Sequence, residues 1–131
     1  MQHEAKGAFD VQVVPVAQKE YAGGTKLGRF SLAKTFHGDL EATSTGEMLT
    51  AGTAVAGSAG YVAIERVEGT LAGRKGSFVL QHSGSMAGGS QSLAISVVPD
   101  SGTGDLTGIS GTLAIEIAGK EHFYRFEYTL P

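Results

Sequence analysis

A tyrosine, a glutamate and a histidine occupy positions from which neighbouring strands could bring them onto one face. Tyr61 and Glu65 lie in the alternating run 61–67, and His82 ends the run 77–82. Side chains an even number of residues apart on a strand point to the same side of a sheet. A carboxylate beside an imidazole can transfer a proton or anchor the polar end of a ligand. Glu65 and His82 are therefore the candidate catalytic groups.

The length of the connection between the two runs decides which residues face each other. A four-residue loop pairs Glu65 with His82. A two-residue turn pairs Glu65 with Leu80 and leaves His82 opposite Ala63. A three-residue loop brings Arg66 to the inner face, which we disfavour because the phenylalanine and leucine of the second run are expected inside. The two even-numbered loops put the same four side chains on one face: Tyr61, Glu65, Phe78 and His82.

The last apolar run, residues 122–130, predicts a strand with one aromatic face. His122, Tyr124 and Tyr128 alternate with charged and polar residues, as in the wall of a pocket. A structural role competes with this interpretation, because buried charges commonly pair with each other and tyrosine hydroxyls often only hold a core together. The candidate ligand-binding residues are Tyr61, Glu65, Phe78, His82, His122, Tyr124 and Tyr128.

Metal, thiol and nucleotide chemistry lack their usual motifs. The sequence has no cysteine, and its four histidines show no spacing typical of metal ligands. The pair Gly102-x-Gly104 is followed by neither a predicted helix nor Gly-Lys-Ser/Thr, so it does not indicate a phosphate-binding loop. No Gly-x-Ser-x-Gly motif of a serine hydrolase is present. We expect no metal and no cofactor.

Composition indicates one globular domain over residues 1–131. The net charge is −3 without a dense basic segment, which argues against nucleic acid as a partner. No apolar run approaches the roughly 18 residues of a membrane helix. The segment 1–7 lacks the apolar core of a signal peptide, so a cytoplasmic, bacterial protein is expected.

Period-two alternation runs through the chain, whereas helical periodicity is hard to find. The 20 glycines fall between short apolar runs, where turns and bulges need them. About eight strands with short connections predict an all-β, antiparallel, up-and-down barrel with little or no helix. The longest expected loop is 15–26. The expected runs are centred on 9–13, 29–45, 48–55, 61–67, 77–82, 93–98, 113–118 and 122–130.

A glycine-rich block at 101–111 carries a family resemblance. It is similar to the Gly-Gly-Thr-Gly-x-Phe-x-Gly-x-x-Gly block of allene oxide cyclases and dirigent proteins, with Ser101 and Leu106 at two of the motif positions. Nearly the whole chain also resembles an uncharacterised bacterial family, a domain of unknown function in the same barrel superfamily. The stretches that carry this resemblance are 27–29, 60–67, 73–82, 98–104 and the alternating residues of 122–130.

The resemblance implies an eight-stranded barrel with a largely apolar interior, and it implies no activity. In allene oxide cyclases such a barrel holds an unsaturated fatty-acid epoxide and steers its ring closure, but their catalytic carboxylate has no match here. We therefore expect a calyx that binds an apolar or amphipathic small molecule. One alternative is a cyclase or isomerase that uses Glu65 or His82 for proton transfer. Another is a filled barrel that forms homo-oligomers or binds a partner through outward Val62, Ile64 and Val79.

Overall fold

A computed structural model describes residues 2–131 as a closed barrel of eight strands in sequence order, each antiparallel to its neighbours. The only helical segment in this range is a single 3-10 turn, Gly104–Leu106. The all-β up-and-down barrel expected from the alternation is thus confirmed. The strands are β1 (Gln2–Glu20), β2 (Lys26–Gly38), β3 (Leu40–Gly52), β4 (Ala59–Leu71), β5 (Arg74–Ala87), β6 (Ser90–Val97), β7 (Ser110–Ala118) and β8 (Glu121–Thr129).

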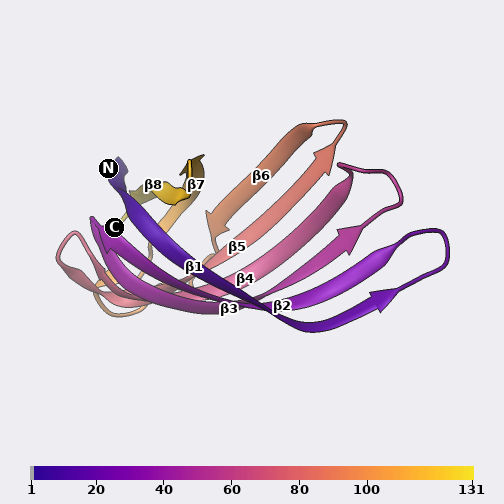
Figure 1. Ribbon diagram of the computed structural model, residues 1–131. Coiled ribbons are helices and arrows are strands. Elements are labelled where there is room, and N and C mark those ends of the chain that lie inside the picture. The colour runs from indigo at the N-terminus through magenta and orange to yellow at the C-terminus, as the bar shows by residue number, and fades with distance from the viewer. Residues whose placement is uncertain (1) are drawn as a thin grey trace.

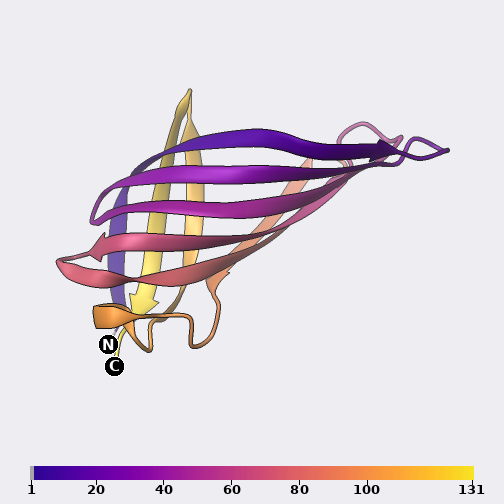
Figure 2. The same cartoon turned by 90° about the horizontal axis from the view of Figure 1, so that it is seen from below.

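The barrel is closed over only part of its length. β8 pairs with the segment Gln2–Phe9 of β1, and β6 meets β7 through the single pair Ser96 and Thr112. Beyond these contacts β1 to β6 continue as a curved sheet, while the short β7 and β8 stand across the long strands (Figures 1 and 2). We call the part enclosed by β8 the closed half, and the part formed by the far ends of β1 to β6 the open half.

The closed half is filled with side chains. Phe126 stacks on Phe78 and on Tyr128, with ring centroids 5.5 and 5.2 Å apart. Tyr124 fastens the turn between β2 and β3, because its hydroxyl donates to the His37 carbonyl at 2.9 Å and accepts from the Leu40 amide at 2.9 Å. The aromatic face of β8 therefore supports the core and the neighbouring turn.

The glycine-rich block crosses this end of the barrel and substitutes for a strand beside β5. The Thr103 amide donates to the Ser77 carbonyl at 2.8 Å, and the Ser101 hydroxyl accepts from the Val79 amide at 3.0 Å. Leu106 and Ile109 are buried in the core beneath. The block is therefore the end cover of the barrel, and it leads into strand β7 as expected.

Two details of the predicted strands are decided by the structure. β4 and β5 are joined by the two-residue turn Ala72–Gly73, so Glu65 faces Leu80, as one of the predicted registers required. The expected long loop 15–26 is wrong, because β1 continues to Glu20 with an irregularity after Pro15. Proline is tolerated there because this part of β1 has no β8 partner and is an edge strand.

Candidate functional site

A cluster of buried polar side chains lies midway along the inner surface of β2 to β5. Glu65 has no exposed surface and accepts two hydrogen bonds, from Lys34 Nζ to Oε2 at 2.9 Å and from Ser44 Oγ to Oε1 at 3.1 Å. His82 Nε2 lies 2.8 Å from Oε2 but makes no hydrogen bond of good geometry within residues 2–131, so we treat it as a close polar contact. We call Lys34, Ser44, Glu65 and His82 the charged layer.

Lys34 is the member of the charged layer that sequence reasoning missed. It follows Phe30 and Leu32 at even spacing on β2 and precedes Phe36, so the alternation itself places it inside. Its ammonium group lies 5.1 Å from the centroid of the Phe9 ring and 5.9 Å from that of Phe36. The aromatic faces and the Glu65 carboxylate together compensate for removing this charge from water.

The electrostatics of the charged layer favour an ionised Glu65. Burial alone would raise the pKa of this carboxyl group, because a charge is poorly solvated inside the barrel. The polar contact with His82 and the charge and hydrogen bond of Lys34 act in the opposite direction and outweigh burial. The net result is a Glu65 pKa below its ordinary value of 4.5.

The lowered pKa of Glu65 predicts a pH-dependent contribution to stability. A carboxyl group with a lower pKa in the folded state stabilises the fold above its unfolded pKa and loses that contribution as the pH falls through the folded pKa. We therefore expect the difference in unfolding free energy between the wild type and Glu65→Gln to be largest above about pH 4.5 and to shrink below it. Urea unfolding of both proteins between pH 7 and 3 measures this difference. A difference that grows toward low pH would contradict the assignment.

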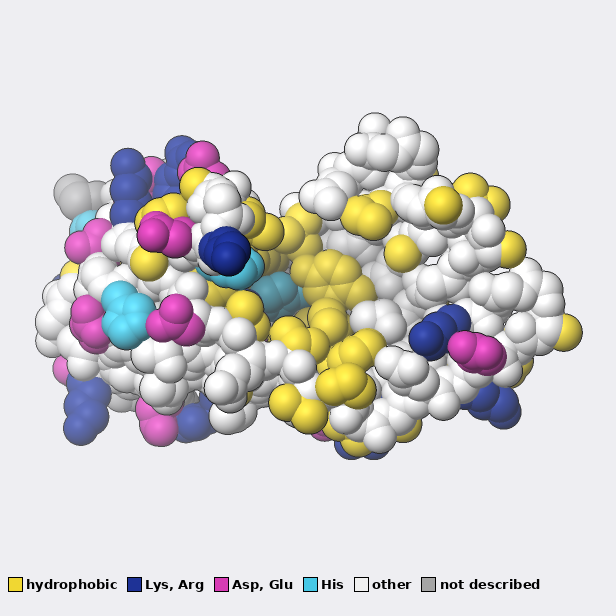
Figure 3. All heavy atoms as spheres, viewed as in Figure 1, with side chains coloured by type: hydrophobic (Ala, Val, Ile, Leu, Met, Phe, Trp, Pro, Cys, Tyr) yellow, Lys and Arg dark blue, Asp and Glu magenta, His cyan; other side chains and the backbone are white. Residues whose placement is uncertain are grey.

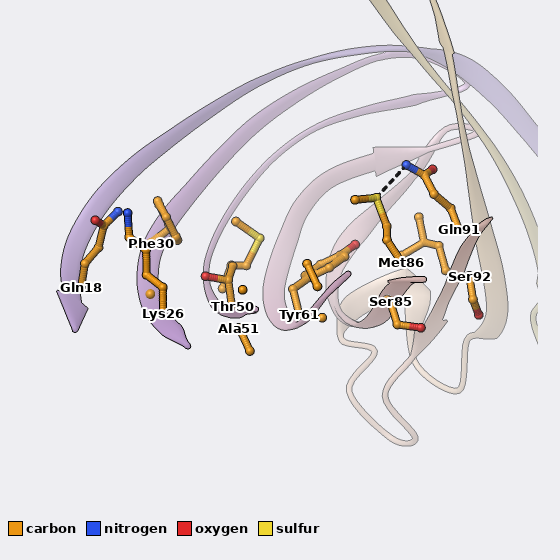
Figure 4. Close-up of a pocket in the computed structure, with 17 residues that line it drawn as sticks. Gln18, Lys26, Phe30, Thr50, Ala51, Tyr61, Ser85, Met86, Gln91 and Ser92 are labelled. Carbon is orange, nitrogen blue, oxygen red and sulfur yellow. Dashed lines mark hydrogen bonds between the residues drawn. The ribbon is translucent and has the colours of Figure 1, made fainter. Parts of the chain in front are cut away.

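A pocket of about 490 Å³ opens on the inner surface of the open half, next to the charged layer. Phe30 and Tyr61 contribute to its wall, and Lys26, Gln18 and Gln91 stand farther out along their strands (Figure 4). Met48, paired with Phe30, and Leu93, paired with Gly84, also line it. Hydrophobic side chains gather in the hollow between the two halves of the molecule (Figure 3). The remaining lining residues are Gly28, Thr50, Ala51, Gly52, Ala59, Gly60, Gly84, Ser85, Met86 and Ser92.

Tyr61 connects the pocket to the charged layer. Its ring centroid is 6.4 Å from that of His82, and it faces Gly84 across the β4–β5 pair. A Cβ atom on Gly84 would lie 2.5 Å from the Tyr61 ring, so the absence of a side chain there lets the ring lie against β5. Burial, followed by the negative charge of Glu65, raises the pKa of Tyr61. The phenol therefore keeps its proton at neutral pH.

The candidate residues chosen from the sequence lie in three places. Tyr61, Glu65 and His82 come together where the charged layer meets the pocket. His122 is half-buried on β8 and packs against Phe9, with ring centroids 5.3 Å apart. The other three lie in the packed core of the closed half: Phe78, Tyr124 and Tyr128.

Residues 2–131 contain no group of three or more histidine, aspartate or glutamate side chains arranged to hold a metal ion. None of the helical structure in the same range is long and apolar enough to cross a membrane.

Together the fold and the site define a small antiparallel β-barrel protein with a buried ion pair and an open, largely apolar pocket. Residues 5–128 match the family model described as a protein of unknown function, DUF3224, and the chain belongs to this family. It is also similar to a crystal structure from Shewanella oneidensis MR-1, described as a protein with unknown function from the DUF3224 family. The two share 54% identity over 100% of this chain and 98% of that one, with a TM-score of 0.95. No curated protein matches the sequence.

Proposed function

We propose that this protein is a small calyx, related to the allene oxide cyclase type of barrel, that binds an apolar or amphipathic small molecule in its open half. The observation that carries the proposal is the pocket of about 490 Å³ on the inner surface of the sheet. Ligand pockets typically measure about 300–1,000 Å³ and combine an apolar lining with a few polar groups. The lining described above has this composition.

The contrast between the two halves of the barrel supports this proposal. Inner side chains of the closed half pack against one another, and Phe126 is fully buried. Inner side chains of the open half remain accessible, and Leu93 keeps 46% of its surface exposed although it points to the same side as Ile95. Removing apolar surface from water is favourable. A ligand that covers the accessible apolar surface of this concave site therefore gains binding free energy.

The geometry supports binding more strongly than proton-transfer catalysis. Both carboxylate oxygens of Glu65 are already engaged, and neither Glu65 nor His82 is among the residues that line the pocket. A general base must come within hydrogen-bond reach of the proton it removes. We therefore infer that the charged layer has a structural role beside the pocket. We rank the cyclase or isomerase alternative below binding.

Native mass spectrometry of freshly purified protein tests the proposal directly. We expect a population that carries an additional small-molecule mass, which is lost after extraction with organic solvent. Protein that is free of added mass and also fails to bind an apolar fluorescent probe would contradict the proposal. The same spectra report the mass of the assembly, which bears on the second candidate below.

A matched pair of tryptophan substitutions locates the bound molecule. Met48 lines the pocket, whereas its neighbour Leu49 points outward and is 56% exposed. We expect Met48→Trp to fill the pocket and weaken binding of an apolar probe at least about tenfold, because roughly 1.4 kcal/mol of lost contact energy suffices for that factor. Leu49→Trp adds the same ring to the outer surface and should leave binding unchanged. Equal affinities of the two variants in a fluorescence titration would place the bound probe elsewhere.

An apolar patch on the outer surface favours a second role, association between copies of the chain. Leu49 on β3 and Val62 on β4 are direct cross-strand neighbours and are half or more exposed, and Ile64 is similarly exposed. Outward Val79 is less accessible than these three. Antiparallel sheets normally carry polar residues on their solvent side, so such a patch is typical of a contact surface. This role is compatible with a ligand on the opposite face of the sheet.

A further inference from the structure

One row of directly paired residues crosses the pocket from β1 to β6. Each member is the register partner of the next, so all six positions point to the inner side of the sheet, and all six line the pocket. The row can be followed across the pocket from Gln18 to Thr50 and Tyr61 in Figure 4. Its members are, in order, Gln18, Gly28, Thr50, Tyr61, Gly84 and Leu93. A glycine therefore flanks each of the two central side chains.

The two central side chains point apart, each toward the glycine beside it. A Cβ atom on Gly28 would lie 2.7 Å from the Thr50 hydroxyl oxygen and 2.8 Å from a ring carbon of Phe30. A Cβ atom on Gly84 would lie 2.5 Å from the Tyr61 ring. Neighbouring side chains thus occupy the space that a side chain at either glycine would fill. The middle of the row is left to the pocket.

The backbone does not require glycine at either position. Gly28 lies within β2 and Gly84 within β5, and neither is among the residues of the described range 2–131 that have a positive φ. Glycine inside a strand weakens the strand, and it often marks a place where a ligand approaches closely. The space above the sheet, and not the backbone conformation, is therefore what an added side chain would change.

From this row we propose that Gly28 and Gly84 are specificity-determining residues, which set the width of the pocket. They admit a broad apolar body, such as a fused ring system, where larger residues would admit only a narrow chain. The inference rests on the proposed binding function and specifies the shape of its ligand. Alanine at either position would displace Phe30 or Tyr61 into the pocket, because the added methyl group stands between the ring and the sheet.

Two uncharged primary alcohols with the same number of carbon atoms test the inference: 2-naphthalenemethanol is broad, whereas 1-undecanol is a narrow chain. Calorimetric titration gives the affinity of each alcohol for the wild type and the variants. We expect Gly84→Ala to weaken binding of 2-naphthalenemethanol at least about tenfold and that of 1-undecanol less than about threefold. Gly52→Ala is the matched control. Gly52 also lines the pocket, but the atom nearest to its Cβ would be 3.9 Å away, so both affinities should stay unchanged.

A double variant shows whether the loss of affinity comes from the displaced ring. Tyr61→Ala removes the ring that Gly84→Ala displaces. Adding Gly84→Ala to Tyr61→Ala should therefore change the affinity for 2-naphthalenemethanol less than about threefold. Gly28→Ala tests the other side of the pocket with the same expectation as Gly84→Ala, and it decides the inference if Gly84→Ala does not fold.

The outcomes separate the failure of the inference from that of the binding function. If neither alcohol binds to the wild type, the proposed function fails and the inference with it. If both alcohols bind, but Gly84→Ala and Gly28→Ala, shown to be folded by thermal unfolding, retain the wild-type affinities, the binding function stands and the role of the glycines is overturned. That role is equally overturned if the variants weaken both alcohols by the same factor, or if the wild type binds 1-undecanol only.

Discussion

Replacing Glu65 by glutamine is expected to lower the free energy of unfolding by about 3–5 kcal/mol, the usual cost of removing one partner from a buried ion pair. Lys34 would remain inside the barrel with its charge, held only by the rings of Phe9 and Phe36. The glutamine keeps the size of the side chain and can still interact with Ser44 and His82. The expected loss of stability therefore comes from removing the carboxylate charge, because the substitution leaves no cavity.

Urea unfolding at pH 7 measures this effect, and the chain provides a matched control. Glu47 is also paired with a basic side chain, Arg29, but both are more than half exposed, so Glu47→Gln should cost less than about 1 kcal/mol. The double variant Lys34→Met, Glu65→Leu removes both charges and is expected to recover much of the stability lost in Glu65→Gln. Similar losses in Glu65→Gln and Glu47→Gln would show that the charged layer does not stabilise the fold in the way described here.

The position of the charged layer explains why one half of the barrel is packed and the other open. Toward the closed half, β2 continues to Phe36, which lies in the core, whereas in the opposite direction it reaches Phe30 in the pocket wall. Lys34 lies between them, buried and paired with Glu65 at 2.9 Å. The ion pair therefore forms the boundary at which the packed core ends and the pocket begins.

Alternation along the strands predicted much of the site but not its cation. Tyr61, Glu65 and His82 were found together because side chains at even spacing share a face whatever the exact loop length. Lys34 obeys the same rule on β2, but lysine is almost never fully buried unless it is paired, and its partner lies 31 residues away on β4. Lys34 on β2 reaches Glu65 on β4 across the intervening strand β3. This contact depends on how the sheet curves, which the sequence does not specify.

Turn geometry was the part of the fold that the sequence left open. The two-residue turn between β4 and β5 places Ala72 at φ 49° and Gly73 at φ 85°. Hairpin turns of this kind favour Asn-Gly or Asp-Gly, and alanine at positive φ gives no such signal. The length of β1 was likewise underestimated, because Pro15 indicates an interruption unless the strand is known to lie at an edge. Both differences arise from tertiary context.

Replacing Gly102 by alanine is expected to destabilise the fold by about 3 kcal/mol, because the new methyl group would collide with main-chain atoms. A Cβ atom at this position would overlap the carbonyl oxygen of Leu106 and lie 3.0 Å from the Ile109 side chain. The same carbonyl accepts a hydrogen bond from the Ile109 amide at 3.1 Å. A backbone contact cannot be relieved by a change of rotamer, so the end cover of the barrel would have to move.

Gly52→Ala is the matched control for this prediction, since the nearest atom to its Cβ would be 3.9 Å away and the change should cost less than about 1 kcal/mol. Urea unfolding measures both losses of stability, and amide hydrogen exchange shows where in the fold they arise.

We expect faster exchange of the Val79 and Thr103 amides in Gly102→Ala, because these amides donate to Ser101 and Ser77 across the barrel end. If Gly102→Ala were as stable as Gly52→Ala, the glycine-rich block would not be the tightly packed cover described here. The position of Gly102 in that block would then need an explanation other than close backbone packing.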